Sequence, residues 1–501
     1  MRRLFVLGVA LVGVVAGGVG PVVASAATPV VKVSPRTGHP SAVIRVTGSG
    51  FGASEAVDVY FDTTDVVLAV TSPTGGFTVP VTVPASAQPG GHWVSAVGRA
   101  DGLAAQAKFT VRTDWPQFGF DARDQRVNPY ENTLTPSTAS GLDEAWQFKA
   151  TYSIYSSPAV VGGVAYFGDA NFGPDDGNVY AVNAATGVLK WKFAAGSQVI
   201  SSPAVSGGTV YVGASNGHVY ALKAATGAVK WDDDLSGLES SGFYGSPTVA
   251  GGTVYIGGTS GNVYALDAAI GFSKWVGLTG GPIRSAPAVA GGDVFVESED
   301  QNLYAFNAST GASVWSLLLD GSSSSGGSVI AGPAVANGRV FVGTVVSNVQ
   351  GIRVSDGSRL WTTPLSSFGV DTSPAVNAGV VYVNDGAGPL VALNTATGTT
   401  LWTAGGTANV FDGSPAYADG VVYTHGFDAV EAYRASDGTL LWSADDGSQS
   451  RSSPTVTNGT VYMATLDGVL RAYTLGTTTA ASRPAPATLR PSQTLRPTRT
   501  S

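Results

Sequence analysis

The sequence contains no cysteine, in a chain of 501 residues. This absence excludes disulfide bonds, thiolate nucleophiles, iron–sulfur clusters and cysteine-rich zinc sites. Charged side chains are sparse, at 12% of the residues, and the formal net charge is −8. A net-negative surface with few lysines argues against general nucleic-acid binding, so we expect no nucleic acid among the partners.

Glycine and apolar residues are abundant instead. There are 67 glycines, and hydrophobic residues make up 44% of the chain. This content suffices for a packed core, so the chain is not of the disordered class. The length suggests two or three domains. Composition alone predicts a soluble all-β protein punctuated by glycine and names no substrate.

The two ends of the chain differ from the rest. Residues 1–26 begin with Arg2 and Arg3, continue with an apolar run, and end in Ala24-Ser25-Ala26. This order is typical of a cleaved secretory signal peptide. A membrane anchor is the alternative, but glycines interrupt the run. No other segment is apolar enough to span a bilayer, so we expect a secreted, extracellular protein without a membrane span after cleavage.

Residues 478–501 form a tail rich in Pro, Thr and Arg that contains four arginines and no acid. Such a segment cannot bury enough apolar surface to fold, and we expect it to be disordered. The simplest interpretation is a solvated tail, which we favour because spread charges attract weakly at physiological salt. The alternative is electrostatic attachment to an anionic cell surface.

Residues 28–112 contain seven short runs in which apolar and polar residues alternate, separated by turn residues such as Gly75-Gly76. This pattern predicts an antiparallel β-sandwich. The SGFG turn and the late PGxxxV strand resemble a bacterial Ig-like domain, and the resemblance implies a spacer or adhesive module. His39 and His92 have no ligand-spaced partner and are interpreted as structural or surface residues.

The remainder of the chain is an internal repeat. A proline that opens a strand recurs every 39 to 46 residues, at Pro158, Pro203, Pro247, Pro287, Pro333, Pro374, Pro415 and Pro454. Each unit holds four strand-length runs, which is typical of a β-propeller blade. Pairs such as Gly207-Gly208 and Asn458-Gly459 suit the positive φ of type I′ hairpins.

The recurring tryptophans indicate the number of blades. Seven recur, each four residues after the glycine of a Thr-Gly or similar turn (Asp-Gly at two of the seven), at Trp191, Trp231, Trp275, Trp315, Trp361, Trp402 and Trp442. The eighth unit stops before its tryptophan, while Trp146 has no three strands before it. We therefore expect an eight-bladed β-propeller whose last blade takes its outer strand from the N-terminal side, which leaves no open seam. The periodic tryptophans are interpreted as packing between blades, with each indole N–H needing a partner.

The pattern SPAVxxGxVYVGxxxGxVYALxAxTGxxxW resembles the PQQ-like β-propeller repeat of the quinoprotein superfamily, over residues 143–477. The segment 115–134, within a lead-in of residues 113–142, also resembles the segment that precedes such propellers. One branch of that superfamily implies pyrroloquinoline quinone (PQQ) held with calcium and oxidation of alcohols or sugars. Another branch keeps the propeller for binding proteins. Fold alone does not decide between them.

Several features disfavour the enzymatic branch. Its alcohol oxidisers typically carry a vicinal cysteine pair and long insertions over the cofactor, and both are missing here. No catalytic Asp with neighbouring Asn and Glu calcium ligands can be placed residue by residue. We therefore expect no cofactor and no catalytic residue, and keep a PQQ- and calcium-dependent dehydrogenase as the alternative.

Other chemistry has less support. His39, His92, His218 and His425 are too scattered for a metal site. The oxygen donors Asp169, Asn171, Asp175 and Asp176 lie in one loop, but calcium needs six or more oxygens and no glutamate closes the loop. We interpret this loop as a solvated turn and expect no metal. No G-x-S-x-G, HExxH or P-loop motif occurs.

A ligand would sit at the channel mouth. The residue three positions before each aligned proline varies while its neighbours stay small, and these joins between blades should lie near the mouth. The candidates for ligand binding are Tyr155, Tyr244, Arg284, Asp371, Asp412 and Arg451, with Ile200 and Ile330 completing the ring. Such a mixed ring suits a polar or protein ligand. Alternatively these are loop residues without function, and the arginines pair with the aspartates across the channel.

The sequence thus predicts a secreted, non-enzymatic binding or scaffolding protein, whose partner is an extracellular or cell-wall protein or a polar ligand. A purely structural spacer without a specific ligand is the third hypothesis. Association with the cell surface is compatible with the same features.

Overall fold

The computed structural model describes residues 28–171, 177–319, 331–365, 369–385, 389–405, 413–426 and 428–476. Within them the regular secondary structure is almost entirely β-strand, and the one helical element is a 3-10 turn, η1 (Ala139–Gly141). The all-β expectation is confirmed. The expected signal peptide and tail, together with Asp175, Asp176, Ile330 and Asp412, lie outside the described residues.

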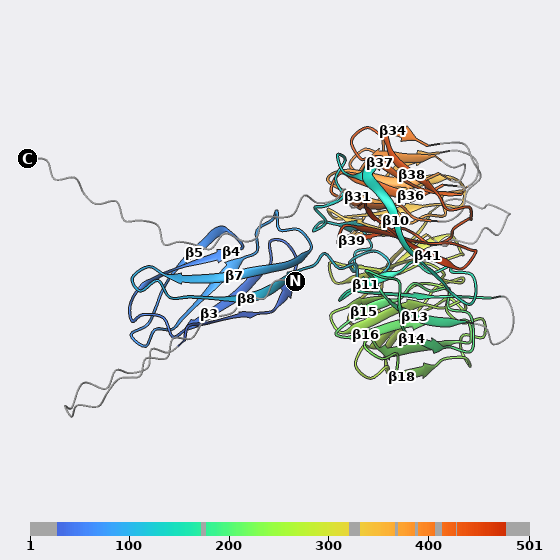
Figure 1. Cartoon of the computed structure of the whole chain (residues 1–501). Coiled ribbons are helices and arrows are strands. Elements are labelled where there is room, and N and C mark those ends of the chain that lie inside the picture. Colours follow the sequence, from blue (N-terminus) through green and yellow to red (C-terminus); the bar gives the residue numbers. More distant parts are fainter. Residues whose placement is uncertain are drawn as a thin grey trace, which may run out of the picture.

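Residues 30–111 form a β-sandwich, drawn in blue in Figure 1. Two sheets pack on a core that includes Val46 and Phe109, both fully buried. The first sheet has the order β1-β3-β6 and the second β2-β8-β7-β4-β5. Their strands are β1 (Val30–Ser34), β2 (Thr37–Gly38), β3 (Val43–Ser49), β4 (Ala56–Phe61), β5 (Thr64–Val70), β6 (Phe77–Thr82), β7 (Gly90–Gly98) and β8 (Ala104–Val111).

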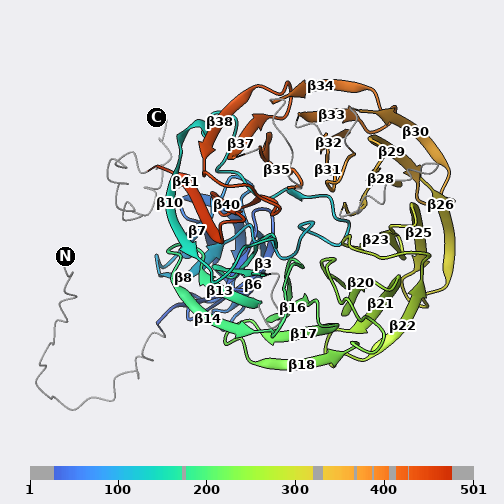
Figure 2. The ribbon, with the colours of Figure 1, turned by 90° about the vertical axis from the view of Figure 1, so that its right-hand side faces the viewer.

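The rest of the described chain is a β-propeller. Figure 2 shows its sheets arranged radially, with β18, β22, β26, β30 and β34 on the rim. Blades 1 to 4 run outward in chain order: β11 (Ala159–Val161), β12 (Val164–Gly168), β13 (Asn178–Asn183), β14 (Leu189–Ala194); β15 (Ala204–Ser206), β16 (Thr209–Gly213), β17 (His218–Lys223), β18 (Val229–Asp234); β19 (Thr248–Ala250), β20 (Thr253–Gly257), β21 (Asn262–Asp267), β22 (Ser273–Leu278); β23 (Ala288–Ala290), β24 (Asp293–Glu297), β25 (Asn302–Asn307), β26 (Ser313–Leu318).

Blades 5 to 7 follow the same order, and blade 8 closes the ring with both ends of the propeller. Its outer strand is β10 (Leu142–Lys149), which pairs antiparallel with β41. The strands are β27 (Ala334–Ala336), β28 (Arg339–Gly343), β29 (Asn348–Arg353), β30 (Arg359–Pro364); β31 (Ala375–Asn377), β32 (Val380–Asn384), β33 (Leu390–Asn394), β34 (Thr400–Ala404); β35 (Ala416–Ala418), β36 (Val421–His425), β37 (Ala429–Arg434), β38 (Leu440–Asp445); β39 (Thr455–Thr457), β40 (Thr460–Ala464), β41 (Val469–Leu475).

The turns between the inner and second strands have the conformation that their residues favour. Both glycines of Gly207-Gly208 have positive φ, and so do both residues of Asn458-Gly459. This geometry matches the twist of a two-residue hairpin. Each turn sends an alternating, β-branched second strand back through the core.

Tryptophans fasten each blade to the next one. The Trp191 Nε1–H of blade 1 donates to the carbonyl of Ala224 in blade 2, at 2.8 Å. A Cβ at Gly227 would lie 2.6 Å from the same indole, so the ring packs directly on a glycine. Trp442 Nε1 donates to the Leu142 carbonyl and joins blade 7 to blade 8, and Trp146 Nε1 of blade 8 donates to the Ala184 carbonyl of blade 1. Packing between blades, as expected, is therefore the role of these residues.

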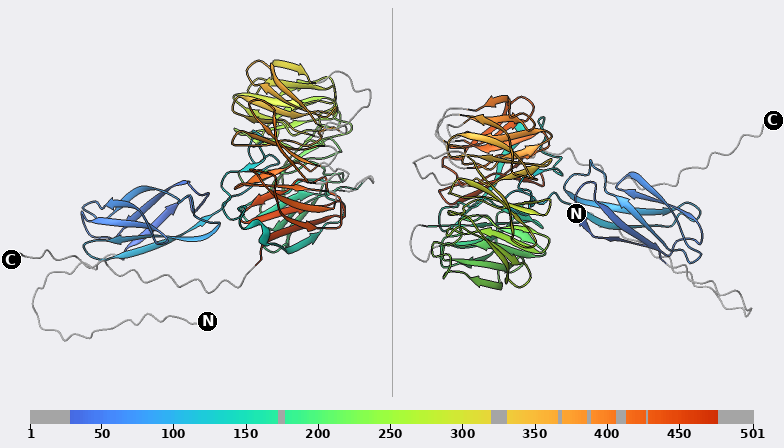
Figure 3. Two further views of the ribbon diagram at one scale, coloured as in Figure 1. Left: turned by 90° about the horizontal axis from the view of Figure 1, so that it is seen from above. Right: turned by 180° about the vertical axis from the view of Figure 1, so that it is seen from behind.

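The propeller has two faces, and the sandwich adjoins one of them (Figures 1 and 3). On this sandwich-side face lie the hairpin turns that follow the inner strands. Here Asn132 Nδ2 donates to the carbonyls of Ala85 and Ala87, and the ring of His39 stacks on Tyr130 at 3.8 Å. The joins between blades lie at the opposite ends of the inner strands. We call that side the mouth face.

Candidate functional site

The lead-in closes the channel on the sandwich side by bonding to the inner strands. Figure 2 shows this segment crossing the centre of the ring. In seven blades the residue two after the aligned proline donates its backbone N–H to the lead-in, at 2.6 to 3.0 Å. These bonds are Val160 to Trp115, Val205 to Pro116, Val249 to Gln117, Val289 to Ala122, Val335 to Arg123, Val376 to Gln125 and Tyr417 to Arg126. In blade 8, Asn128 Nδ2 donates to the Val456 carbonyl instead.

Arg126, whose side chain is fully buried, anchors this segment. Its guanidinium donates to the carbonyls of Phe118 at 2.7 Å, Pro415 at 2.8 Å and Pro454 at 3.3 Å. Burial lowers the pKa of Arg126 to about 10, against the opposing effect of Asp124. The bonds join blades 7 and 8 to the lead-in.

Asp124 is the second buried charged residue of the lead-in, with 1% of its surface exposed. Within the described part of the chain, neither carboxylate oxygen has a hydrogen-bond partner. Burial raises the pKa of Asp124 well above its usual range, although Arg126 opposes the shift. A buried carboxyl without donors is costly, and such groups concentrate at functional sites.

A ring of buried serines lies at the start of the inner strands, on the mouth side. In six of the eight blades the residue before the aligned proline donates its backbone N–H to the serine Oγ of the next blade, at 2.6 to 2.9 Å. The bonds are Ser157 to Ser202, Ser202 to Ser246, Gly332 to Ser373, Ser373 to Ser414, Ser414 to Ser453 and Ser453 to Ser157. Blades 4 and 5 carry Ala286 and Gly332 at this position, so the ring of hydroxyls is interrupted there.

The gap in the serine ring lies beside Asp124. A Cβ at Gly332 would be 2.7 Å from Asp124 Oδ2, 2.9 Å from the Ala286 carbonyl oxygen and 3.2 Å from Ser373 Oγ. Three oxygens therefore lie close together beside Gly332, on the side of blades 4 to 6. One of them belongs to the carboxyl without a donor.

The predicted mouth residues are engaged with aromatic or charged neighbours. The Arg284 guanidinium lies 4.7 Å from the Tyr244 ring centroid, and its Nε contacts Glu299 Oε1 at 2.8 Å. Arg451 lies 6.0 Å from the ring of Tyr155. Ile200 and Asp371 are partly exposed on the same set of joins. The structure thus brings Tyr155 together with Arg451 and Tyr244 together with Arg284, while Asp412 falls outside the described residues.

Three further polar residues of the mouth face were missed by the sequence analysis. They occupy the last position of the second strand, which is glycine in four blades and alanine in blade 8, but Glu297, Asn384 and His425 in blades 4, 6 and 7. The four glycines are needed because a Cβ would meet the next join; at Gly168 it would lie 2.5 Å from Val199. The sequence did contain a signal for these residues, because the repeat loses its glycine at this position. The second strands of blades 4, 6 and 7 end in FVE, YVN and YTH instead.

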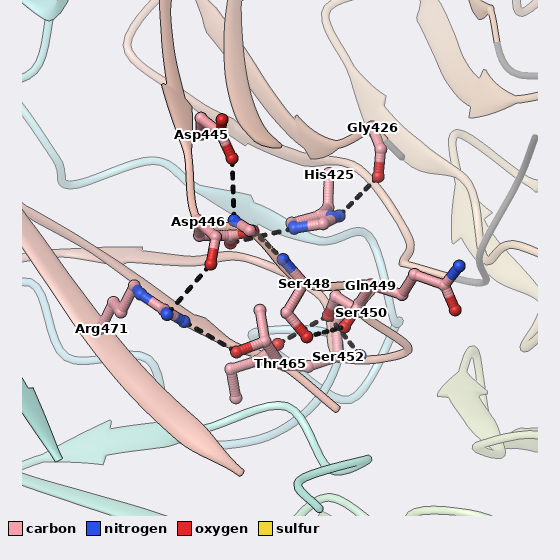
Figure 4. Close-up of polar contacts among 12 residues, drawn as sticks. His425, Gly426, Asp445, Asp446, Ser448, Gln449, Ser450, Ser452, Thr465 and Arg471 are labelled. Atoms are coloured by element: carbon pink, nitrogen blue, oxygen red, sulfur yellow. Dashed lines mark hydrogen bonds and ion pairs between the residues drawn. The ribbon is translucent and has the colours of Figure 1, made fainter. Parts of the chain in front are cut away.

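His425 is the centre of a buried polar network between blades 7 and 8, shown in Figure 4. Its Nε2 contacts Asp446 Oδ2 at 3.0 Å, and both side chains are at most 1% exposed. Its Nδ1 lies 2.6 Å from the Gly426 carbonyl. Arg471 continues the network by donating to Thr465 Oγ1 and to the Asp446 carbonyl. Both ring nitrogens of His425 therefore face oxygen atoms that can accept hydrogen bonds.

This His–Asp pair does not have the geometry of a nucleophilic triad. In a triad the second ring nitrogen faces the nucleophile, whereas here it faces a backbone carbonyl. Nearby Ser448 and Ser450 donate to the carbonyls of Gln449 and Ala464. The described contacts therefore give this network a structural and electrostatic role.

The interpretation of Asp169 as part of a solvated turn was wrong. Asp169 is fully buried. Its carboxylate accepts from the backbone and side-chain nitrogens of Asn178, from Tyr180 Oη and from the Tyr152 backbone N–H, at 2.7 to 3.0 Å. Four donors already satisfy the two oxygens, so this residue secures a turn against the neighbouring join.

The remaining histidines are separate from one another. His92 contacts Asp62, and His218 contacts Asp232 at 2.8 Å. Across the described ranges no group of three or more His, Asp or Glu residues could hold a metal ion. No chemical step is assigned to these residues.

The lead-in also lines a cavity of about 370 Å³ on the sandwich side, next to blades 2 and 3. Asp121 on its wall is engaged by Arg123, and Tyr130 is covered by His39. The cavity lies on the closed side of the channel. It is therefore separate from the predicted mouth.

Comparison with known families identifies the family to which the repeat belongs. The family described as "Outer membrane protein assembly factor BamB" matches residues 135–276, 215–366, 321–411 and 388–498, which together extend over more than half of the chain. The chain belongs to this family. Its members share the PQQ-like repeat, so that part of the resemblance is confirmed. No curated protein matches the chain significantly.

Solved structures of both branches share the fold of this BamB-family chain. BamB from Moraxella catarrhalis is 20% identical with a TM-score of 0.57, over 66% of this chain and 99% of that one. A quinohemoprotein alcohol dehydrogenase from Pseudomonas putida HK5 is 19% identical with a TM-score of 0.62, over 75% and 82%. One from Comamonas testosteroni is 15% identical with a TM-score of 0.63, over 73% and 81%. At these identities the likeness concerns the fold alone.

Proposed function

We propose that this BamB-family propeller is a secreted, non-enzymatic binding or scaffolding protein that holds a protein or polar ligand on its mouth face. The contact residues proposed are Tyr155, Tyr244, Arg284, Asp371, Asp412 and Arg451. The observation that carries the proposal is the placement of two arginine–aromatic pairs on the mouth face. Arg284 lies 4.7 Å from the Tyr244 ring centroid, and Arg451 lies 6.0 Å from the Tyr155 ring centroid.

The two faces of the propeller carry different groups. The lead-in covers the inner strands on the sandwich side and uses their backbone donors. The mouth face carries the aromatic and arginine pairs, and residues of these types are enriched where proteins meet. The family is described as an assembly factor, which supports partner binding over chemistry.

The export of the chain, the Ig-like nature of the sandwich and the disordered basic tail belong to the same proposal. Residues 1–26 would be removed on export, and residues 28–112 would hold the propeller away from a surface. Within the described part of the chain no helix is long and apolar enough to cross a membrane. Mass spectrometry of the mature protein should find an N-terminus at Ala27; retention of residues 1–26 would contradict export by cleavage.

The binding proposal is tested by comparing the wild type with an Arg284→Ala/Arg451→Ala variant. Immobilised mature chain would capture partners from the extracellular fraction of the native host. We expect a discrete protein that the double variant captures at least about tenfold less, since each arginine contributes at typical hot-spot magnitude. A Lys230→Ala/Lys274→Ala variant on the outer strands is the matched control. Equal capture by all three proteins would contradict the proposal.

The alternative function, a PQQ- and calcium-dependent alcohol or sugar dehydrogenase, has a direct test. Titration of residues 27–501 with the quinone and calcium is followed by tryptophan fluorescence and by dye-linked oxidation of an alcohol and sugar panel. We expect no saturable change at micromolar quinone. Stoichiometric binding with dye reduction would replace the scaffold proposal by the dehydrogenase.

A further inference from the structure

The cavity on the sandwich side is a ligand-sized space that the proposed function does not use. It has a volume of about 370 Å³ and lies between the lead-in and the inner strands of blades 2 and 3. Apolar side chains line most of it, among them Phe120, Tyr130, Val205 and Val249. Walls of this composition are typical of a pocket that holds an apolar group.

The aromatic part of the wall has a strained backbone. Phe120 has a φ of +72°, which is uncommon for a bulky side chain and costs free energy on folding. Its ring centroid lies 5.3 Å from that of Trp115 and 6.2 Å from that of Tyr130. Backbone strain of this kind concentrates at ligand-binding sites. Surfaces built from aromatic rings are also where proline-containing segments dock.

The charge of the wall favours a cationic group. Asp114 and Asp121 are the charged residues on it, and both are acidic. Asp121 is already paired with Arg123. Asp114 accepts a hydrogen bond from the Gly162 backbone at 3.0 Å, and within the described ranges no ion pair engages its carboxylate. A ligand that combines an apolar body with one positive charge therefore matches this cavity.

The tail of the chain contains this chemistry twice. The tetrapeptide Thr-Leu-Arg-Pro occurs at 488–491 and again at 494–497, and nowhere else in the sequence. Leu489 and Leu495 are the only large aliphatic or aromatic residues after Gly476. A tail that served only to stay in solvent would have no use for them. The proline restricts the arginine before it, which lowers the entropy lost on binding.

The tail leaves the propeller on the side of the cavity. Gly476 directly follows β41, and the last residues of β41 pair with the first residues of β40. The turn before β40 carries Asn458, which exchanges two hydrogen bonds with Thr113, at 2.7 and 2.9 Å. Thr113 directly precedes Asp114 of the cavity wall. The described chain therefore ends one strand away from the turn that adjoins the cavity.

The segment between the propeller and the first motif is long enough to reach the cavity. It comprises residues 477–487, and a flexible segment of this length spans about 20 Å on average. A motif on such a tether has an effective concentration of about 1 mM at its site. A site with a dissociation constant of about 0.1 mM would then be about 90% occupied. Weak contacts therefore suffice for the tail to dock.

We propose that this cavity is a recognition site for the Thr-Leu-Arg-Pro motif, and that the chain's own tail supplies the motif. The leucine and proline fill the apolar part beside Phe120 and Val249, and the guanidinium pairs with Asp114. The two copies of the motif compete for one cavity, which raises its occupancy. The site is independent of the mouth face, so the inference goes beyond the proposed function and does not rest on it.

The test measures the binding of a synthetic peptide of residues 487–501 by calorimetry. The peptide is titrated into chain 27–477 and into chain 27–501; the shorter chain retains every described strand. We expect the peptide to bind chain 27–477 about tenfold more tightly, because the tethered tail competes for the cavity in chain 27–501. Equal affinity for the two chains would overturn occupation of the cavity by the tail.

A second peptide separates recognition of the motif from general attraction. In it, leucine and arginine exchange places within each motif, so composition and charge are unchanged. It should bind chain 27–477 at least about fivefold more weakly, because the apolar and charged groups no longer meet their partners. Equal binding of the two peptides would show attraction to an acidic face only and would overturn the inference.

Two variants of chain 27–477 locate the peptide. Ser206→Trp places a large ring at the exposed edge of the cavity and should weaken binding by at least about tenfold. Asn377→Trp is its matched control, because Asn377 has the same position at the end of the inner strand of blade 6 and does not line the cavity. Asp114→Asn removes the charge and should weaken binding by about fivefold or more.

Asp419→Asn is the control for charge, since it removes a carboxylate from the first turn of blade 7 on the same face and should change affinity by less than twofold. The Arg284→Ala/Arg451→Ala variant should bind the peptide as the wild type does, because its substitutions lie on the mouth face. Unchanged affinity in both Ser206→Trp and Asp114→Asn would overturn the inference, whereas the proposed function is tested separately by partner capture.

Discussion

Single residues repeated around the ring account for the stability of the propeller. In blades 1 to 6 the periodic tryptophan packs its ring against a glycine of the next blade and donates its N–H there, as Trp191 does to Ala224. These roles were predictable, because a tryptophan that recurs with the strand pattern must face the same neighbour each time. The packing is also local, so one blade can be weakened without changing the mouth.

Replacement of Trp191 by Phe should lower the stability of the propeller by about 1–3 kcal/mol. The change leaves the buried Ala224 carbonyl without its donor and removes part of the ring. Thermal unfolding followed by circular dichroism measures it. Trp93→Phe is the control, since Trp93 is 38% exposed and should change stability by less than about 0.5 kcal/mol. Equal shifts in the two variants would contradict the docking role.

His425→Leu should destabilise the protein by about 3–5 kcal/mol, because it leaves Asp446 buried without its main partner. His425→Leu/Asp446→Leu should recover part of that loss. His218→Leu is the matched control, since its contact with Asp232 is partly exposed and should matter by less than about 1 kcal/mol. Chemical denaturation of the four proteins gives the comparison, and a double variant as unstable as His425→Leu would contradict the pairing.

Asp124 predicts an unusual pH dependence of stability. Burial raises its pKa in the folded state, so folding favours the protonated form. Its contribution is complete below its ordinary pKa of 3.8 and is lost as pH rises towards the folded-state pKa, at about 1.4 kcal/mol per pH unit. The melting temperature of Asp124→Asn relative to the wild type should therefore increase between pH 4 and pH 8. A constant or falling difference would contradict the assignment.

The polar residues of the mouth face illustrate what sequence reasoning can and cannot detect. The aligned second strands end in Gly168, Gly213, Gly257, Glu297, Gly343, Asn384, His425 and Ala464, so three departures were visible in the repeat. Their contacts were not. Asp446 lies 21 residues after His425 in a join between blades, and no period relates the two positions.

At the scale of elements, the strands of the propeller could be predicted from the sequence, whereas the path of the lead-in could not. The repeat gave the strands, the first turns and the closing strand β10, because hydrophobic alternation and turn residues act locally. The lead-in bonds to the blades from residues 115, 116, 117, 122, 123, 125 and 126. The spacing of these residues along the lead-in is irregular and depends on the radius of the finished ring. No local sequence pattern could therefore predict which lead-in residues bond to which blade.

Gly119→Ala tests the lead-in as an element. A Cβ at Gly119 would lie 1.9 Å from Asp124 Oδ1 and 2.3 Å from its Cα, which the folded lead-in cannot accommodate. Hydrogen exchange should accelerate at least about tenfold at the amides of Val289 and Val335, which bond to Ala122 and Arg123. Gly237→Ala, whose Cβ would meet open space, should leave these amides protected. Protection unchanged by Gly119→Ala would contradict the proposed closure.

At the scale of the whole molecule, the family and the architecture support binding at one face. The lead-in and sandwich occupy one side of the ring, and the opposite side carries the paired arginines and the polar departures. The repeat specified that architecture from the sequence, whereas the direction in which the channel is closed became clear only from the fold.

The measurement that tests the central claim most directly is site-specific photo-crosslinking in the native host. A photoreactive phenylalanine analogue would replace Tyr155 on the mouth face, and Phe272, which is 74% exposed on the blade 3 turn at the opposite side, in a control protein. The account predicts one discrete crosslinked protein from position 155 and none from position 272. Crosslinks to the same protein from both positions, or from position 272 alone, would contradict binding at the mouth.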